Sequence, residues 1–76
     1  MKETLNEIEQ RVANNLKIIR RVRGFTLKQV GDVVGVTQQQ IQKYESGNSR
    51  VPLDKLILMA KYFNVNLGFF VKEFKV

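Results

Sequence analysis

The sequence predicts a single all-α domain, residues 1–76, built from five short helices. Apolar residues recur three or four positions apart over most of the chain, which is the spacing of one helix face. Residues that typically begin and end helices stand between these segments. No segment shows the strict alternation that predicts a strand, and 76 residues are the size of one domain.

The first predicted helix covers roughly residues 3 to 23. Its last turns are rich in Lys and Arg, and positive charge there suits the negative end of the helix dipole. Gly24 is the expected C-terminal glycine. The apolar stripe of this helix consists of Leu5, Ile8, Val12, Leu16, Ile19 and Val22.

Two short helices follow, and a glycine separates them. Thr26 is a good N-cap for a helix that runs to Val34, and Thr37 caps the next helix, which runs through Glu45. Gly35 can adopt a positive φ, so the chain can turn sharply between them. Two short helices joined by a tight glycine turn form a helix-turn-helix, here over about residues 26–45.

Each helix of this motif has only a narrow apolar face. Because Gly31 has no side chain, a neighbouring helix can cross close against it. The residues expected to meet one core are Val30, Val34, Val36, Ile41 and Tyr44.

A fourth helix is predicted from Pro52, at its first position, to near Phe63. Asn64 can take the left-handed conformation that ends it. Asn66 then caps a fifth, short helix with the sequence LGFFVKEF. The predicted buried stripe of the fourth helix is Leu53, Leu56, Ile57, Ala60 and Phe63.

The charge distribution indicates a nucleic-acid partner. The net charge is +6, and residues 11–50 alone carry +6, whereas residues 1–10 carry −2 and residues 51–76 carry +2. A basic stripe over a compact domain is the electrostatic footprint of a nucleic-acid binder. A solvated surface that keeps the protein soluble would give the same total.

The composition argues against an enzyme or a metal site. The chain has no Cys and no His, which removes disulfides, thiolate sites, the commonest general base and the commonest metal ligand. The acidic residues are scattered, with no pair at ligand spacing. We therefore expect no catalytic residue, no metal, no cofactor and no small-molecule substrate.

The N-terminal stretch MKETLNEIEQ is acidic and polar, unlike a signal peptide, and no apolar run approaches a membrane span. The sequence therefore predicts a soluble, intracellular protein with no membrane partner.

The run LKQVGDVVGVTQQQIQKYESG resembles the helix-turn-helix of the Xre/Cro–cI family of phage and bacterial repressors. The apolar spacing, the small residue before the turn, Gly35, Thr37 and the Tyr44-Glu45-x-Gly47 ending match the family pattern. The resemblance extends over about residues 12–70.

Two positions depart from the family pattern. The family often has Gln in place of Leu27, where its side chain would touch a phosphate, and Ala in place of Gly31. The first departure puts one backbone contact in doubt, and the second keeps the side chain small at some cost in helix stability.

The resemblance implies a lambda-repressor-like domain that binds double-stranded DNA with its third helix in the major groove. Gln can pair bidentately with adenine N6 and N7, which gives the glutamine run a purpose beyond that of a solvated helix surface. Gln40 is expected to face sideways, and Lys43 could reach guanine or a phosphate. The expected base-reading residues are Gln38, Gln39, Gln42 and Lys43.

Contacts with the DNA backbone are expected around the third helix. The hydroxyl of Thr37 could meet a phosphate as well as cap the helix. Lys17, Arg21 and Arg23 are further phosphate neighbours or simply solvated. The expected phosphate-binding residues are Thr37, Lys28, Asn48, Ser49 and Arg50.

The family resemblance also implies that Arg20 pairs with Glu45. Such a pair would tie the first helix to the end of the third, and the loss of one partner would leave the other charge partly buried.

The phenylalanines near the C-terminus have two interpretations. They can close the core, or they can form an apolar patch shared with a second copy in a homodimer. The residues of this possible dimer contact are Phe69, Phe70 and Phe74.

The expected function is a sequence-specific transcriptional regulator of bacterial or phage origin, cytoplasmic and associated with the nucleoid. It would act as a repressor by occupying an operator and blocking polymerase. The alternative is an antitoxin-like module that binds a toxin through the Phe-rich C-terminus and also binds its own operator.

Overall fold

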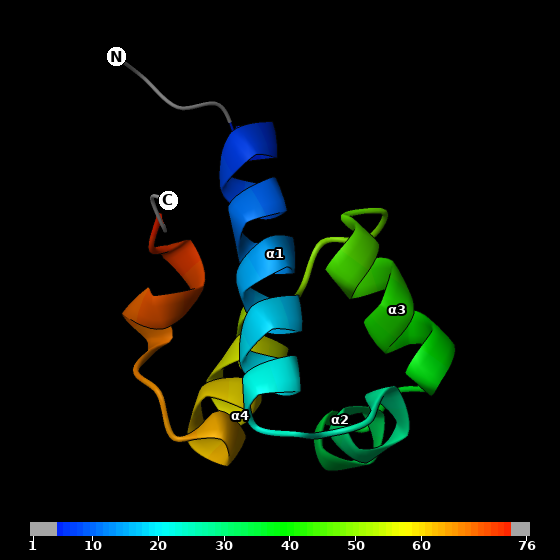
Figure 1. The fold of residues 1–76 in the computed structure, drawn as a ribbon. Coiled ribbons are helices and arrows are strands. Elements are labelled where there is room, and N and C mark those ends of the chain that lie inside the picture. The colour runs from blue at the N-terminus through cyan, green and yellow to red at the C-terminus, as the bar shows by residue number, and fades with distance from the viewer. Residues whose placement is uncertain (1–4, 74–76) are drawn as a thin grey trace.

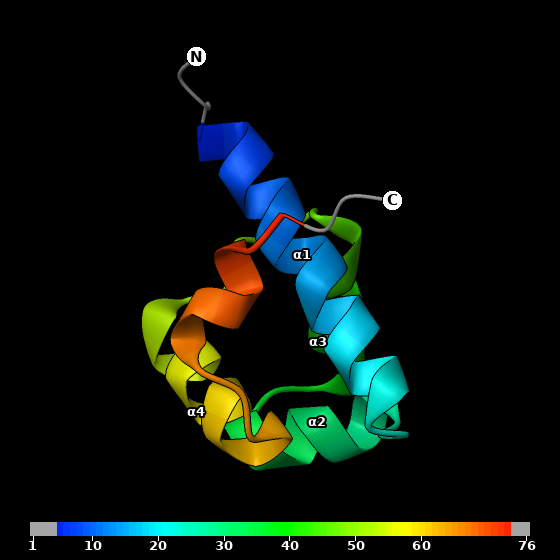
Figure 2. The same cartoon turned by 60° about the vertical axis from the view of Figure 1, so that its left-hand side comes forward.

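The computed structural model describes residues 5–73, and within this range the chain is entirely helical, without strands. The elements are α1 (Leu5–Val22), α2 (Leu27–Val34), α3 (Gln38–Ser46), α4 (Leu53–Phe63) and the 3-10 helix η1 (Leu67–Val71). The long helix α1 runs through the middle of the molecule, with α3 on one side and the segment that contains η1 on the other (Figure 1). α2 and α4 close the end of the fold that lies opposite the first turns of α1 (Figures 1 and 2).

The all-α prediction is confirmed, but the count of five α-helices is not. The described residues form four α-helices, and the predicted fifth helix is the five-residue 3-10 helix η1. Asn66 caps it as predicted, because its side-chain oxygen accepts a hydrogen bond from the backbone N–H of Phe69 at 3.0 Å.

α1 ends at a glycine, as the sequence predicts. Gly24 has a φ of 75°, and the N–H of Phe25 donates to the carbonyl of Arg20 at 3.0 Å, so the last carbonyls of the helix are satisfied. The predicted start near residue 3 and the side chain of Leu5 lie outside the described residues.

The predicted apolar stripe of α1 is wrong at its C-terminal end. Leu16 and Ile19 are buried, but Val22 is 68% exposed. The loop after α1 covers this end of the core instead, because Phe25 stacks on Tyr62 with ring centroids 4.5 Å apart. Phe25, which follows the helix, is partly buried against the core, whereas Val22 is not.

The helix-turn-helix has the predicted caps. Thr26 and Gln29 form a capping box at the start of α2, and the Thr37 hydroxyl accepts a hydrogen bond from the N–H of Gln40 at 3.1 Å at the start of α3. Gly35 turns the chain between the helices with a φ of 79°. These local signals explain why the two short helices begin and end at these residues.

α4 ends at Asn64, which has the predicted left-handed conformation with a φ of 58°. Pro52 is the N-cap of this helix and stands one position before its first residue.

The predicted buried stripe of α4 is wrong on one side. Leu53 is 63% exposed and Ile57 is 40% exposed, whereas Met59 is fully buried together with Phe63. α4 contacts α2 and η1, and the side that it turns to them passes through Met59 rather than through Ile57. Spacing of three and four residues fits both sides of this helix, so it does not decide which side is covered.

The predicted dimer contact through the C-terminal phenylalanines is wrong for Phe70. Phe70 has no exposed surface and belongs to the core, so it is not available for a dimer contact. Phe69 is half-buried and packs edge-on against Phe70, with ring centroids 5.7 Å apart. Phe74 lies outside the described residues. Core closure is therefore the role of Phe70.

A neutral amide holds the C-terminal segment to α1. Asn15 is 2% exposed, and its side-chain nitrogen donates to the carbonyls of Phe69, Phe70 and Lys72 at 3.1, 2.9 and 2.7 Å. The nitrogen has two hydrogens, so one of them is shared between two carbonyls.

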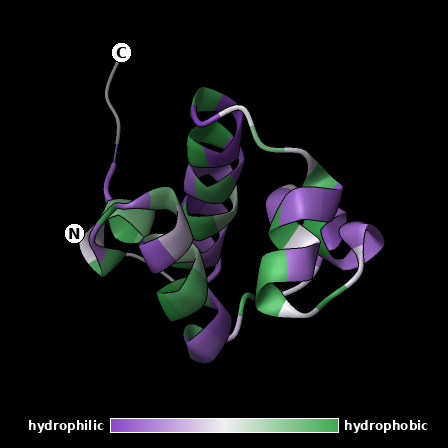
Figure 3. Ribbon diagram, turned by 90° about the horizontal axis from the view of Figure 1, so that it is seen from below, coloured by the Kyte–Doolittle hydropathy of each residue, from purple (hydrophilic) through white to green (hydrophobic). Residues whose placement is uncertain are grey.

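Hydrophobic and hydrophilic residues share every α-helix (Figure 3). The hydrophobic ones meet in one core that includes the fully buried side chains of Leu16, Val30, Ile41, Met59, Phe63 and Phe70. Within residues 5–73, none of the helices has the length and apolarity that a membrane span requires.

Candidate nucleic-acid interface

The outward side of α3 carries a stripe of polar side chains. Ile41 and Tyr44 turn to the core and are buried, so the opposite side of the helix faces solvent. Positions 39, 42, 43 and 46 have the spacing of one helix face, and all four are exposed. We call Gln39, Gln42, Lys43 and Ser46 the polar stripe; together with Asn48 they line a shallow surface depression.

Three of the four predicted base-reading residues belong to the polar stripe. Gln38, the fourth, is exposed in the first turn of α3, one helical turn before Gln42. Gln40 is half-buried, in line with the expectation that it faces sideways. Ser46 belongs to the stripe but was not among the predicted residues, although its position seven residues after Gln39 places it on the same face.

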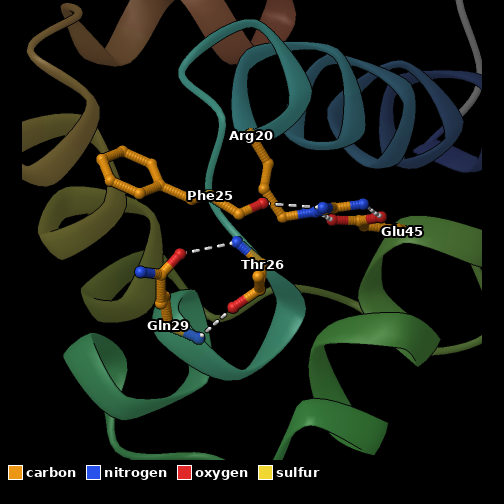
Figure 4. Close-up of polar contacts among 5 residues, drawn as sticks. All are labelled: Arg20, Phe25, Thr26, Gln29 and Glu45. Carbon is orange, nitrogen blue, oxygen red and sulfur yellow. Dashed lines mark hydrogen bonds and ion pairs between the residues drawn. The ribbon is translucent and has the colours of Figure 1, made fainter.

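An ion pair fixes the position of α3 relative to α1. Arg20 Nε donates to Glu45 Oε2 at 2.5 Å and Arg20 Nη2 donates to Glu45 Oε1 at 3.1 Å, a bidentate geometry that also restricts orientation. The two side chains are only 12% and 6% exposed. Arg20 Nη1 also donates to the carbonyl of Phe25 at 2.9 Å, so one guanidinium joins α1, α3 and the loop before α2 (Figure 4).

A close backbone contact sets the turn between α2 and α3. A Cβ atom on Gly31 would lie 2.6 Å from the carbonyl oxygen of Val36. The Gly31 carbonyl accepts hydrogen bonds from the N–H groups of Gly35 and Val36 at 2.8 and 2.9 Å. The close neighbour of Gly31 is therefore the backbone of the turn, and not a crossing helix as the sequence predicts. This contact leaves no room for a larger residue at position 31.

Basic residues of α1 border the polar stripe. Lys17 and Arg21 are exposed and line a second depression between α1 and α3, together with Gln42 and Ser46. Because Gln42 and Ser46 line both depressions, the positive charges of α1 lie next to the outward face of α3. Both residues were expected either to be phosphate neighbours or simply solvated.

Two of the predicted phosphate-binding residues are engaged within the protein. The Lys28 ammonium lies 3.0 Å from the Asp32 carboxylate on the same exposed face of α2. Arg50 pairs with Glu9 in the first half of α1, with side chains 72% and 31% exposed respectively. Both pairs are at the surface, where an ion pair contributes little to stability and can exchange partners.

The remaining predicted phosphate-binding residues surround the ends of α3. Thr37 and Asn48 are exposed, and Ser49 is half-buried. Arg23, a further candidate, donates from Nε to the carbonyl of Phe63 at 2.9 Å, so its side chain joins the end of α1 to the end of α4.

Comparison with known proteins agrees with this geometry. Residues 16–70 match the helix-turn-helix family HTH_3. An uncharacterized HTH-type transcriptional regulator from Sinorhizobium medicae is 33% identical over 72 residues, which are 95% of this chain and 52% of the relative. A similar regulator from Rickettsia conorii is 28% identical over 68 residues, which are 90% of this chain and 54% of the relative. This chain thus spans about half the length of the curated relatives it matches.

Solved structures show the same fold. An HTH_3 family transcriptional regulator from Vibrio cholerae has a TM-score of 0.77 at 25% identity, covering 88% of this chain and 38% of the other. The restriction-modification controller protein C.AhdI from Aeromonas hydrophila has a TM-score of 0.73 at 15% identity, covering 80% of this chain and 92% of the other. At this identity the second likeness shows the fold alone. With its glycine turn, its two capped helices and a family match over residues 16–70, the chain belongs to the Xre-type helix-turn-helix family, whose members are DNA-binding transcriptional regulators and not enzymes.

Proposed function

We propose that this chain binds a specific sequence of double-stranded DNA and represses transcription by occupying an operator. The observation that carries the proposal is the polar stripe, which presents amides on the outward face of α3 beside the positive charges of Lys17 and Arg21. A chain with this function would work in the cytoplasm, at the nucleoid. DNA is the only partner that the proposal requires besides a second copy of the chain.

In the proposed complex α3 lies in the major groove with its N-terminal residues at the base edges. A Gln side chain in the stripe donates to adenine N7 and accepts from adenine N6, and Lys43 donates to guanine O6 or N7. Lys17, Arg21 and Arg50 neutralise phosphates, which positions α3 but carries no sequence information. Repression then follows from occupancy, because polymerase cannot use DNA that the protein covers.

A dimer would suit this mechanism, since helix-turn-helix proteins commonly bind two half-sites one helical turn apart. The antitoxin-like alternative depended on an exposed phenylalanine surface. Because Phe70 is in the core, no observation now favours that alternative.

The proposal is tested by selection from a randomised duplex pool at about physiological salt, followed by sequencing. The expected result is one enriched motif, as an inverted repeat if two copies bind. Binding without enrichment that disappears as salt rises would leave only backbone electrostatics and would contradict the proposal.

Two variants separate base reading from backbone binding. Gln39→Ala is expected to lose about 1–3 kcal/mol of discrimination at one base pair while non-specific affinity is kept. Arg21→Ala is expected to weaken binding to all sequences alike and to reduce the salt slope by about 1. If both variants bound every sequence as the parent does, the assignment of α3 would be wrong.

A further inference from the structure

The outward side of α4 exposes apolar residues that the fold does not use. Leu53, Ile57 and Leu58 are 63%, 40% and 41% exposed. Eight large hydrophobic residues are exposed among the described side chains, and three of them lie on this 11-residue helix. Single exposed hydrophobic residues are common on protein surfaces, but neighbours on one helix face indicate a contact surface.

Two opposite charges lie on the same side of α4. Asp54 is in its first turn, Lys61 is in its last turn, and both are exposed. Positions 54, 57, 58 and 61 have the spacing of one helix face, opposite the buried Met59 and Phe63. Among residues 5–73 neither charge has an ionic partner. The helix dipole accounts for the sign of each charge, but it does not account for the apolar residues between them.

We propose that this face of α4, defined by Asp54, Ile57, Leu58 and Lys61, binds the same face of a second copy of the chain in antiparallel orientation. The inference rests on the proposed function in one respect: this α4 contact would join two copies that occupy neighbouring half-sites on DNA. Pairing through α4 leaves the polar stripe on α3 free.

The self-complementary order of the residues identifies the partner as a second copy. When two identical helices lie antiparallel about a two-fold axis between positions 57 and 58, the Ile57 and Leu58 side chains of both copies gather around the axis. In the same register each Asp54 meets the Lys61 of the other helix, so two ion pairs flank an apolar centre. An isologous contact requires this reciprocity, whereas a partner of another sequence would not require the pattern to be the same in both directions.

The contact is expected to be weak without DNA. One face of a short helix is smaller than the roughly 800 Å² that each partner contributes to a standard stable interface. Binding of both copies to one DNA molecule raises their local concentration, so a weak contact is sufficient there. Figure 2 shows α4 at the periphery of the fold.

Charge reversal tests the register by sedimentation equilibrium without DNA, so the outcome does not depend on operator binding. The parent chain should show a mass that rises from 8.8 kDa towards twice that value as its concentration enters the millimolar range. Asp54→Lys alone and Lys61→Asp alone each place like charges opposite one another and should weaken association about tenfold, corresponding to about 1.4 kcal/mol. The double variant Asp54→Lys/Lys61→Asp restores opposite charges and should restore association.

The matched control is Asp32→Lys, which changes the net charge by the same amount on the exposed face of α2 and should leave association unchanged. Circular dichroism of each variant checks that α4 is still folded. A parent chain that stays monomeric, or a double variant no better than the single ones, would overturn the proposal. A control that weakens association as much as the single variants would show a general charge effect and would overturn it too.

Cross-linking provides a second test that also detects a weak dimer. The chain has no Cys, so introduced thiols are the only ones present. A mixture of Asp54→Cys and Lys61→Cys chains should give a disulfide-linked heterodimer under oxidation, whereas either variant alone should give several-fold less. Equal yields in all three samples would contradict the antiparallel register. A motif enriched in the DNA selection together with failure here would leave the proposed function intact.

Discussion

The two sides of α1 are held by different chemistry. On the side of α3, Arg20 and Glu45 form a nearly buried ion pair. On the side of the C-terminal segment, Asn15 donates a neutral amide to three backbone carbonyls. Both arrangements leave no buried side-chain polar atom without a partner in the described part of the chain. The same helix therefore positions the candidate reading helix by charge and the last segment by uncharged hydrogen bonds.

The difference matters when one partner is removed. A buried charge that loses its partner retains the full cost of its desolvation. A carbonyl that loses a neutral donor loses less, because it carries no net charge. Removal of one partner should thus cost more stability at the Arg20–Glu45 ion pair than at the Asn15 amide.

The largest expected effect is that of Arg20→Ala. The change leaves the Glu45 carboxylate buried without its partner, so the unfolding free energy should fall by about 3–5 kcal/mol. Urea denaturation measures the loss. Arg21→Ala is the matched control, because Arg21 is exposed on the next position and its removal should change stability by less than about 0.5 kcal/mol.

A second variant keeps this prediction testable if Arg20→Ala does not fold. Arg20→Met combined with Glu45→Leu replaces both charges by apolar side chains, and it should recover most of the lost stability. A double variant as unstable as Arg20→Ala would show that the side chains act through packing and not through the unpaired charge.

A smaller effect is expected for Asn15→Ala. The change removes the donor to the carbonyls of Phe69, Phe70 and Lys72, which should cost about 1–3 kcal/mol. Hydrogen exchange should show the loss mainly in η1, while the amides of α3 keep their protection. Asn14→Ala, at the exposed neighbouring position, is the control. Equal loss of protection in α3 would mean that the two sides of α1 are not independent.

The smallest effect on stability is expected for Glu9→Gln, which breaks the exposed pair with Arg50. An exposed ion pair contributes at most about 1 kcal/mol, so the denaturation midpoint should hardly move. DNA affinity should instead rise several-fold for all sequences, since Arg50 no longer has to give up its ion pair with Glu9 before it can bind a phosphate. Glu7→Gln makes the same change in charge as a control, and filter binding over a range of salt compares the two. A lower affinity for Glu9→Gln would show that Glu9 orients Arg50 towards DNA.

Local signals made most of the helix boundaries predictable. Thr26, Thr37 and Asn66 cap their helices, and Gly24, Gly35 and Asn64 end theirs with positive φ. These interactions join residues within about five positions, so they can be recognised without knowledge of the tertiary fold.

The predictions that failed depended on contacts between distant segments. Val22 and Ile57 fit the apolar spacing, but whether such a residue is covered depends on which neighbouring segment packs there. Asn15 was not predicted to be buried, although it lies between Val12 and Ile19 on its helix, because the burial of an amide depends on hydrogen-bond partners that helix spacing does not reveal. Its partners lie more than fifty positions further along the chain.

The candidate site was predictable in its centre and less so at its border. Gln39, Gln42 and Lys43 follow from helix spacing once Ile41 and Tyr44 are assigned to the core. The engagement of Arg50 by Glu9 could not be inferred, because it depends on how the first half of α1 passes the loop after α3.

The polar stripe also makes this chain a convenient scaffold for protein engineering. The side chains of Gln39, Gln42 and Lys43 make no hydrogen bond or ion pair within residues 5–73. The close contact of Gly31 with the backbone of the turn, which holds α3 at its angle, involves none of these three side chains. These three positions can therefore be varied together without redesigning the core. Selection among such variants could change which surface the outward face of α3 recognises, while α3 keeps its place in the fold.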